Sequence, residues 1–397
     1  MASPARPLTD LDFSSGCRIE ELNKLLEELE RRGSIALQGK EVIQTCVQAK
    51  DLIFSLVAQV HPLPSPNAFL LLSGGLCSGS IDVSPTDLGS TSPIICPSIS
   101  YTLLVPIIRL PSPDLLVPCS PCHYLVPPSA WDPAPLLSGP HTSQVSPHDV
   151  SLWFSTALLS VEFSLSDSSL PLSLERAEPW GNSISLLLST PSLFIRFDLV
   201  PVVEVHGWPQ GVQYLDDWVA EDGLPPKVFH LFPWGPGGQW RVGFPGVELY
   251  MRRFLHPALS RVLRASTAVL EQILQKDGAP GPYIVWVTLL QACQRLPRGY
   301  LSQGHNAALC FLGLLEELSR LFLRGSCPNP FLPGCDLLLG STHGPCLAQR
   351  ISEVRAHPAR YLRAVIREAK EVVKGGDKVE KEETEEKEER GSGCYPS

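Results

Sequence analysis

The stretch Ser73-Gly74-Gly75-Leu76-Cys77-Ser78-Gly79-Ser80 decides how the first half of this chain is interpreted. An apolar run over residues 69–72 leads into two pairs of small residues. Glycine tolerates positive φ and lets the backbone approach a phosphate closely. The candidate nucleotide-binding residues are therefore Gly74, Gly75, Gly79 and Ser80. The alternative, which the turn alone favours, is an ordinary loop between two apolar segments.

The next predicted strand, residues 101–108, is β-branched and nearly uncharged, so we expect it to be buried on both faces. Enzymes that transfer nucleotidyl groups need two carboxylates beside such a turn, because two Mg²⁺ ions require oxygen ligands. This strand offers Ser100 and Thr102 and no acid. Asp198 lies within another predicted strand, where an isolated carboxylate is costly without a partner or a function. The sequence predicts no catalytic residue, metal or cofactor, and a structural role for Asp198 is favoured over metal binding.

Composition limits the class of protein. The 397 residues suffice for two or three domains, and 39 prolines predict long irregular loops. No stretch approaches about 18 uninterrupted apolar residues, and no apolar segment follows Met1, so we expect neither a membrane span nor a secretory signal. The 12 cysteines are scattered, which predicts a reduced, cytoplasmic protein. Cys119-Ser-Pro-Cys122-His123 starts like a zinc site, but one cysteine pair cannot complete a tetrahedral site.

Charge is unevenly distributed along the chain. Residues 1–249 carry 12 basic and 25 acidic side chains, whereas residues 250–376 carry 16 basic and 8 acidic ones. Arg109 is the only basic residue between Asp51 and Glu175, which argues against nucleic-acid binding by the first half. The basic residues near the end form what we call the C-terminal arginine stripe: Arg350, Arg355, Arg360, Arg363 and Arg367. Within it, Arg355, Arg360, Arg363 and Arg367 are candidates for docking an acidic receptor tail or an anionic membrane, and a solvated face is the alternative.

Periodicity predicts the order of the elements. Apolar residues at helical spacing predict helices over 17–32, 40–61, 150–165, 249–275 with a break or bend at Pro257, 283–295, 305–323 and from Pro358 to about residue 375. Residues 183–188 and 193–203 are predicted as paired strands. The expected domains are a flexible arm over 1–15, a sheet-containing lobe over 16–246, a helical lobe over 247–376 and a charged, disordered tail over 377–397. Ten prolines predict that residues 111–147 form a mostly disordered insert within the first lobe.

Several of these segments resemble the Mab-21 family. They are the Gly-Gly-x-x-x-Gly-Ser turn, the strand around Asp198, Trp240-Arg241-Val242-Gly243-Phe244, residues 310–318 and residues 327–334. The resemblance implies an α+β, bilobed, nucleotidyltransferase-like fold with a mixed sheet and helices in the first lobe and an all-helical second lobe, as in cyclic GMP-AMP synthase. In that comparison Asp198 matches the third metal-binding acid, while Ser100 and Thr102 fall near the positions of the first two.

One member of that family is similar also over residues 5–13, 49–56, 101–106, 358–364 and 368–370. This resemblance implies a non-catalytic cytoplasmic adaptor for the common beta chain of cytokine receptors. It further implies a role in apoptosis after cytokine withdrawal, at the plasma membrane through the receptor and at mitochondria. Two alternatives remain open: a nucleotide-binding sensor without catalysis, and an active nucleotidyltransferase.

Overall fold

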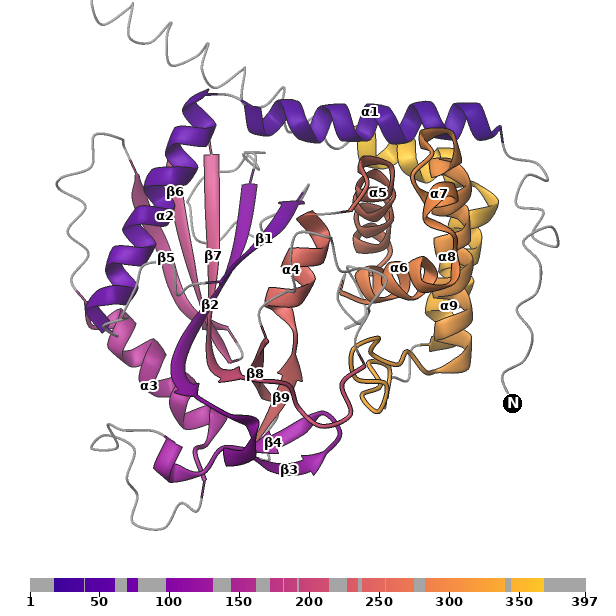
Figure 1. The fold of residues 1–397 in the computed structure, drawn as a ribbon. Helices are drawn as coiled ribbons and strands as arrows, with labels where there is room; N and C mark the ends of the chain where they lie inside the picture. The colour runs from indigo at the N-terminus through magenta and orange to yellow at the C-terminus, as the bar shows by residue number, and fades with distance from the viewer. Residues whose placement is uncertain are drawn as a thin grey trace, which may run out of the picture. The chain divides into compact units, whose positions relative to one another are not determined.

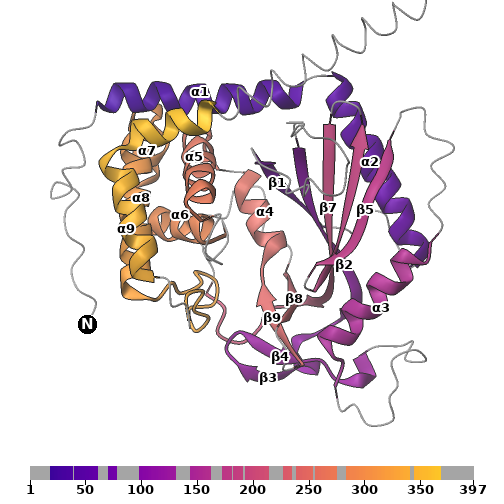
Figure 2. The same ribbon diagram turned by 180° about the vertical axis from the view of Figure 1, so that it is seen from behind.

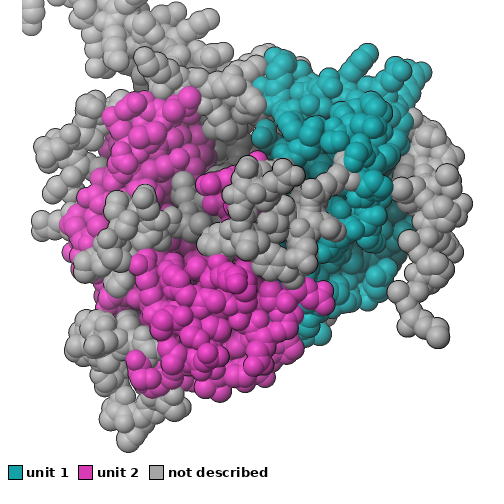
Figure 3. All heavy atoms as spheres, viewed as in Figure 1, with its two compact units in different colours: residues 1–33, 215–217, 254–367 teal, residues 34–214, 218–253, 368–397 magenta. Residues whose placement is uncertain are grey.

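The computed structural model describes residues 18–38, 40–60, 70–77, 98–130, 144–161, 172–180, 182–190, 193–213, 227–234, 238–253, 255–274, 283–339 and 344–367. The predicted arm, the charged tail and the pair Gly79–Ser80 lie outside these residues. The described chain is α+β, as expected. It divides into two compact units, shown in Figure 3. We call residues 1–33, 215–217 and 254–367 the helical unit, and residues 34–214, 218–253 and 368–397 the sheet unit.

The sheet unit is built on nine described strands in the order β1-β2-β7-β8-β9-β4-β3, with β5 and β6 joined to β7 through β6. They are β1 Leu70–Cys77, β2 Ser98–Leu110, β3 Val117–Ser120, β4 His123–Leu125, β5 Ser173–Trp180, β6 Ser183–Thr190, β7 Leu193–His206, β8 Val228–Trp234 and β9 Gln239–Gly243. The sheet is mixed, because β2 and β7 run parallel while the other pairs run antiparallel. β7 is central: β2 pairs along one edge, and β6 and then β8 pair along the other.

Burial alternates along β7. From Leu193 to Leu199 the odd-numbered side chains are buried and the even-numbered ones are half-buried, as a period of two requires. α2 (Lys40–Val60) and α3 (Pro147–Leu159) pack against β7 and lie end to end along the sheet in both views (Figures 1 and 2). The prediction that residues 101–108 are a buried strand is confirmed, since Leu103, Leu104 and Val105 are at most 1% exposed.

The glycine-rich stretch differs from its prediction. Gly74 and Gly75 do not form a turn but lie inside β1, which continues to Cys77. The pairing with β2 changes register between Ser73 and Leu76, so the two glycines occupy a bulge. A bulge adds a residue to one strand, and glycine is common there because it accepts unusual backbone angles.

The proline-rich segment also differs from its prediction. Residues 111–130 are ordered and contain the short helices η3 (Pro113–Leu115) and η4 (Pro128–Ala130) on either side of the hairpin β3–β4. β4 pairs with β9, and Trp240 donates its indole N–H to the carbonyl of Val145 at 3.0 Å. Proline lacks an N–H, but it is accommodated in an edge strand such as β3. Only residues 131–143 of the predicted insert lie outside the described residues.

The helical unit contains most of the predicted helices. They are α1 Ile19–Gln38, of which residues 34–38 fall in the sheet unit, α5 Pro257–Leu274, α6 Tyr283–Arg295, α7 Arg298–Leu301, α8 Ala307–Arg324 and α9 Gly344–Ala356, followed by helical residues 358–367. The expected interruption near Pro257 is present, because α4 (Pro245–Arg253) ends before it and α5 begins at it. None of the described helices is long and apolar enough to span a membrane.

α1 packs with the helical unit rather than with the sheet. Its Leu22 and Leu26 are at most 2% exposed. The amide of Asn23 donates to the carbonyl of His305 and accepts from the N–H of Ala308, each at 2.9 Å. Arg261 of α5 donates to Glu30 at 2.8 Å. The expected lobe boundary at 246/247 would place α1 with the sheet and α4 with the helices, whereas contacts place each in the other unit.

Candidate functional site on the central strand

The carboxylate of Asp198 lies in the middle of β7 and is held from two sides. Arg196 donates its Nε–H to Asp198 Oδ1 at 2.9 Å, and the hydroxyl of Ser185 on β6 donates to the same oxygen at 2.7 Å. Asp198 and Arg196 are two residues apart, so they project from the same face of the strand. The side chain of Asp198 is 25% exposed. Asp198 therefore has the ionic and hydrogen-bond partners that a carboxylate within a strand was expected to need.

The two positions predicted to lack metal-binding acids lie beside this pair. Thr102 and Ser100 on β2 are directly opposite Asp198 and Arg196 in the parallel register. The structure thus brings the three sequence-predicted positions together on one face of two neighbouring strands. It also places a guanidinium among them. At an effective dielectric of about 20, like unit charges 4 Å apart repel by about 4 kcal/mol, so this arginine disfavours a divalent ion at the same place.

A second carboxylate lies further along the same face of β7. Glu204 is 3.4 Å from Arg109 on β2 and 3.4 Å from His206. The imidazole of His230 on β8 is 3.8 Å from it. Burial, followed by the nearby His206, lowers the pKa of His230 to about 4, so this imidazole is neutral at physiological pH. Glu204 and Asp198 are six residues apart in a strand, roughly 20 Å, and cannot share a metal ion.

No group of three or more histidine, cysteine, aspartate or glutamate side chains is arranged to hold a metal within the part of the chain that the structure describes. Cys119 and Cys122 lie in the β3–β4 hairpin with free thiols, and His123 directs its Nδ1 to the hydroxyl of Ser120 at 2.9 Å. Of the candidate nucleotide-binding residues, Gly74 and Gly75 lie in β1, and Gly79 and Ser80 fall outside the described residues.

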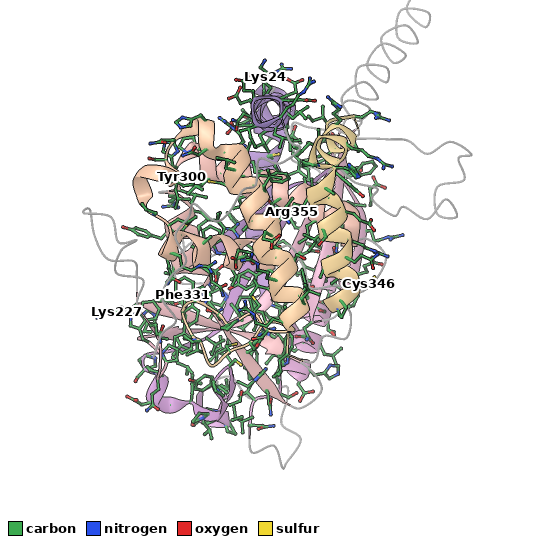
Figure 4. The ribbon with its side chains drawn as sticks, turned by 90° about the vertical axis from the view of Figure 1, so that its right-hand side faces the viewer. Lys24, Lys227, Tyr300, Phe331, Cys346 and Arg355 are labelled. Atoms are coloured by element: carbon green, nitrogen blue, oxygen red, sulfur yellow. The ribbon has the colours of Figure 1, made fainter. Side chains whose placement is uncertain are left out.

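The C-terminal arginine stripe does not act as a single surface. Arg355 of α9, labelled in Figure 4, pairs with Glu316 of α8 at 2.7 Å. Arg363 pairs with Glu21 of α1. Arg360 and Arg367 are exposed, and neither side chain forms an ion pair with any described residue. Seven residues separate them on one helix, which places them on the same face two turns apart.

Sequence reasoning missed several residues that define this site. Arg196 is two positions before Asp198, and an arginine and an aspartate at i and i+2 in a predicted strand indicate a same-face ion pair. That signal was available from the sequence. Ser185, His230 and Arg109 gave no local signal, because strand pairing between distant segments brings them to β7.

These features define a class: an α+β protein with a mixed sheet, in which both acids of the central strand β7 lie beside arginines. No family model matches the chain. The chain is similar to "Transmembrane protein 102" of Bos taurus, with 28% identity over 489 aligned positions that cover 94% of this chain and 95% of the relative. It is similarly related to "Transmembrane protein 102" of Mus musculus, with 28% identity over 485 positions and the same coverage. Both alignments are longer than the 397 residues of this chain, so they include gaps opposite it.

Proposed function

We propose that this chain is a non-catalytic adaptor built on a degenerate nucleotidyltransferase-like fold of the Mab-21 type. The observation that carries the proposal is the pairing of Asp198 with Arg196 and Ser185, at 2.9 and 2.7 Å, beside Ser100 and Thr102. Two-metal transfer chemistry needs several carboxylates free to bind cations. Here the one acid is occupied by a permanent positive charge, and its neighbours on β2 are hydroxyl groups.

The candidate docking surface of the adaptor is narrower than the sequence suggested. Arg360 and Arg367 face outward from helical residues 358–367, while Leu362 and Val365 of the same segment are at most 2% exposed. Arg355 and Arg363 stabilise the helical unit through Glu316 and Glu21 instead. An acidic partner segment would then be recognised by the guanidinium groups of Arg360 and Arg367.

The resemblance to one member of the Mab-21 family supplies the named partner, the cytosolic segment of the cytokine receptor common beta chain. We propose a cytoplasmic protein that reaches the plasma membrane through that receptor and acts in apoptosis after cytokine withdrawal at mitochondria, with peripheral membrane association as the other use of the surface.

The proposal is tested by binding that receptor segment to the full chain and to the double variant Arg360→Glu/Arg367→Glu. We expect affinity to fall by about tenfold or more, because each reversal replaces an attraction by a repulsion. The matched control is Arg264→Glu/Arg324→Glu, which makes the same charge change at two exposed arginines of the helical unit. An equal loss of affinity in both double variants would mean that net charge alone controls binding. No loss of affinity in either variant would show that Arg360 and Arg367 do not form the docking surface.

Catalysis and nucleotide sensing are tested separately. Incubation of the chain with labelled nucleoside triphosphates and Mg²⁺ or Mn²⁺ should give no product, and formation of product would overturn the non-catalytic assignment. A sensor without catalysis would instead be stabilised by its ligand in proportion to occupancy. We expect no shift of the thermal midpoint with GTP or ATP, and a concentration-dependent rise would favour the sensor.

A further inference from the structure

Trp234 is a large aromatic side chain at the end of β8 that is 47% exposed. The guanidinium of Arg241 on β9 lies over its ring, 4.3 Å from the ring centroid. The imidazole of His123 on β4 lies 6.1 Å from the same centroid. Arg241 pairs with both Phe232 and His123 in the strand register, so three neighbouring strands bring these side chains to one face. This face lies toward the β3 edge of the sheet, on the strands that follow β7 in the sheet order.

The cation on this face has no anionic partner among the described residues. Arg241 forms no ion pair and no hydrogen bond to another described side chain, although its guanidinium has five N–H donors. Its stacking on Trp234 holds the guanidinium in one plane and leaves its edge free to donate. Burial, and after it the charge of Arg241, lowers the pKa of His123, so that its imidazole is neutral beside the guanidinium.

His123 lies beside the guanidinium of Arg241. Its Nδ1 lies 2.9 Å from the hydroxyl oxygen of Ser120, which also accepts from the N–H of Cys122 at 3.4 Å. Its Nε2 is buried and has no hydrogen-bond partner in the described structure. The imidazole therefore adds aromatic surface next to Trp234, and Arg241 is the group that can donate to a ligand.

Apolar side chains continue this face past the donors. Val117 of β3 is 52% exposed and pairs with Leu125, which lies two residues from His123 and so on the same side of β4. Leu115, just before β3, is 46% exposed. Exposed tryptophan and arginine beside aliphatic groups are the composition of protein-interaction hot spots. We call Val117, His123, Trp234 and Arg241 the Trp234 patch.

We propose that the Trp234 patch binds an extended acidic peptide segment of a partner protein. One carboxylate of the peptide accepts from Arg241, and a neighbouring apolar side chain packs on Trp234 and Val117. One guanidinium matches a single carboxylate. A nucleic acid is disfavoured because a phosphate backbone requires several basic residues, and the Trp234 patch contains one, Arg241. This surface goes beyond the proposed function, since it lies in the other unit from Arg360 and Arg367.

The test selects a random-peptide phage library on the immobilised full chain and measures the enriched peptide by fluorescence anisotropy. We expect a consensus with Asp or Glu next to an apolar residue. Affinity should fall about tenfold or more in Trp234→Ala and Arg241→Gln, and less in Arg241→Lys, which keeps the charge but loses the planar fork. The control Arg176→Gln, on β5 of the same unit, should bind within about twofold of the wild type, as expected for a substitution outside the interface.

The thermal midpoint of each variant checks that the fold is retained, and we expect it to stay near that of the wild type because Trp234 is exposed and not part of the core. A synthetic peptide with Asn or Gln in place of its acid should lose the same factor as Arg241→Gln. The proposal is overturned if no peptide is enriched, if the consensus lacks an acid, or if binding is unchanged by both the Trp234 and the Arg241 substitutions.

Discussion

Arg196 Nε and Asp198 Oδ1 lie 2.9 Å apart on one face of β7, separated by two residues in sequence. The arginine thus occupies the side of the carboxylate that a divalent ion would need. Thr102, directly across the parallel register from Asp198, offers only a hydroxyl group. If this arrangement is what prevents metal binding, adding acids on β2 and removing the arginine should create a site.

The first prediction concerns that designed site. The triple variant Ser100→Asp/Thr102→Asp/Arg196→Gln would place three carboxylates on adjacent strands with no cation among them. We expect it to bind Mn²⁺ at least about tenfold more tightly than the wild type, because hard divalent ions need several oxygen ligands. Electron paramagnetic resonance of free Mn²⁺ during titration measures the difference.

The matched control for this experiment is Ser100→Asp/Thr102→Asp with Arg196 retained, which should bind Mn²⁺ more weakly than the triple variant. The idea is contradicted if the wild type already binds Mn²⁺ tightly and loses that binding in Asp198→Asn. That outcome would also restore Asp198 as a metal ligand.

A second prediction concerns Asn23, which completes the start of a distant helix. Residue Asn306 at the beginning of α8 makes no side-chain capping bond, and Asn23 of α1 accepts from the N–H of Ala308 instead. Removing a helix cap costs about 1 kcal/mol. Asn23→Ala should therefore lower the thermal midpoint by about 2–4 °C, as a loss of that size does in a unit of 150–250 residues.

Two companion variants separate capping from mere substitution on α1. Asn23→Asp keeps the oxygen that accepts from the N–H of Ala308. Its loss of thermal midpoint should therefore be at most half of the loss in Asn23→Ala. Lys24→Ala changes the neighbouring exposed side chain, labelled in Figure 4, and should leave the midpoint unchanged. Equal midpoints for Asn23→Ala and the wild type would show that α8 does not depend on this bond.

The sequence predicted the elements whose signal is local. Alternation and β-branching identified β2, β6 and β7, and helical spacing identified α2, α6 and α8 close to their observed ends. Prediction from the sequence failed for segments whose structure depends on pairing with distant parts of the chain. Nothing in residues 111–130 indicates that β4 pairs with β9, so their prolines suggested disorder. Likewise, α1 has an amphipathic pattern that fits either unit, and contacts with distant residues such as Ala308 and Arg261 decide between them.

The local features of the candidate site were predictable from the sequence. They are the hydroxyl side chains of Ser100 and Thr102, where acids would be needed to bind metal, and Arg196 two residues before Asp198. The grouping of Glu204 with Arg109 and His230 is not, because it requires the register of three strands whose residues lie up to 121 positions apart in the chain. The Trp234 patch depends on the same kind of long-range pairing.

A third prediction follows from the burial of His230. Its pKa is about 4 in the folded chain and about 6.5 when unfolded. Below pH 6.5 the unfolded state takes up a proton that the folded state refuses, so stability is complete above that pH and falls as the pH drops towards 4. The shift is worth up to about 3 kcal/mol at 1.36 kcal/mol per pKa unit. Glu204 Oε2, 3.8 Å away, is beyond hydrogen-bond range and does not reverse the effect of burial, and Arg109 and His206 add positive charge nearby.

Urea denaturation between pH 7 and pH 4 measures this dependence. His230→Gln, which carries no titrating group, should flatten the curve by about the same amount. His305→Gln, at an exposed position of the helical unit, should leave it unchanged. An identical pH slope in His230→Gln and the wild type would mean that other groups control acid stability.

The last prediction concerns Gly344, where α9 meets α8. A Cβ added at Gly344 would lie 2.4 Å from the backbone oxygen of Phe322, a contact that cannot be relieved by rotating a side chain. Gly344→Ala should therefore force the two helices apart and cost about 1–3 kcal/mol, as overpacking does in other interiors. Gly299→Ala is the matched control, because nothing lies within 4 Å of its added methyl group. At that helical position alanine should be neutral or stabilise by up to about 1 kcal/mol, since it restricts the unfolded chain.

Because Arg355 reaches Glu316 across the same pair of helices, the Gly344 variant should also weaken that ion pair. Hydrogen exchange of α9 amides would detect the separation, and equal stability of the two alanine variants would show that α8 and α9 do not approach this closely in solution.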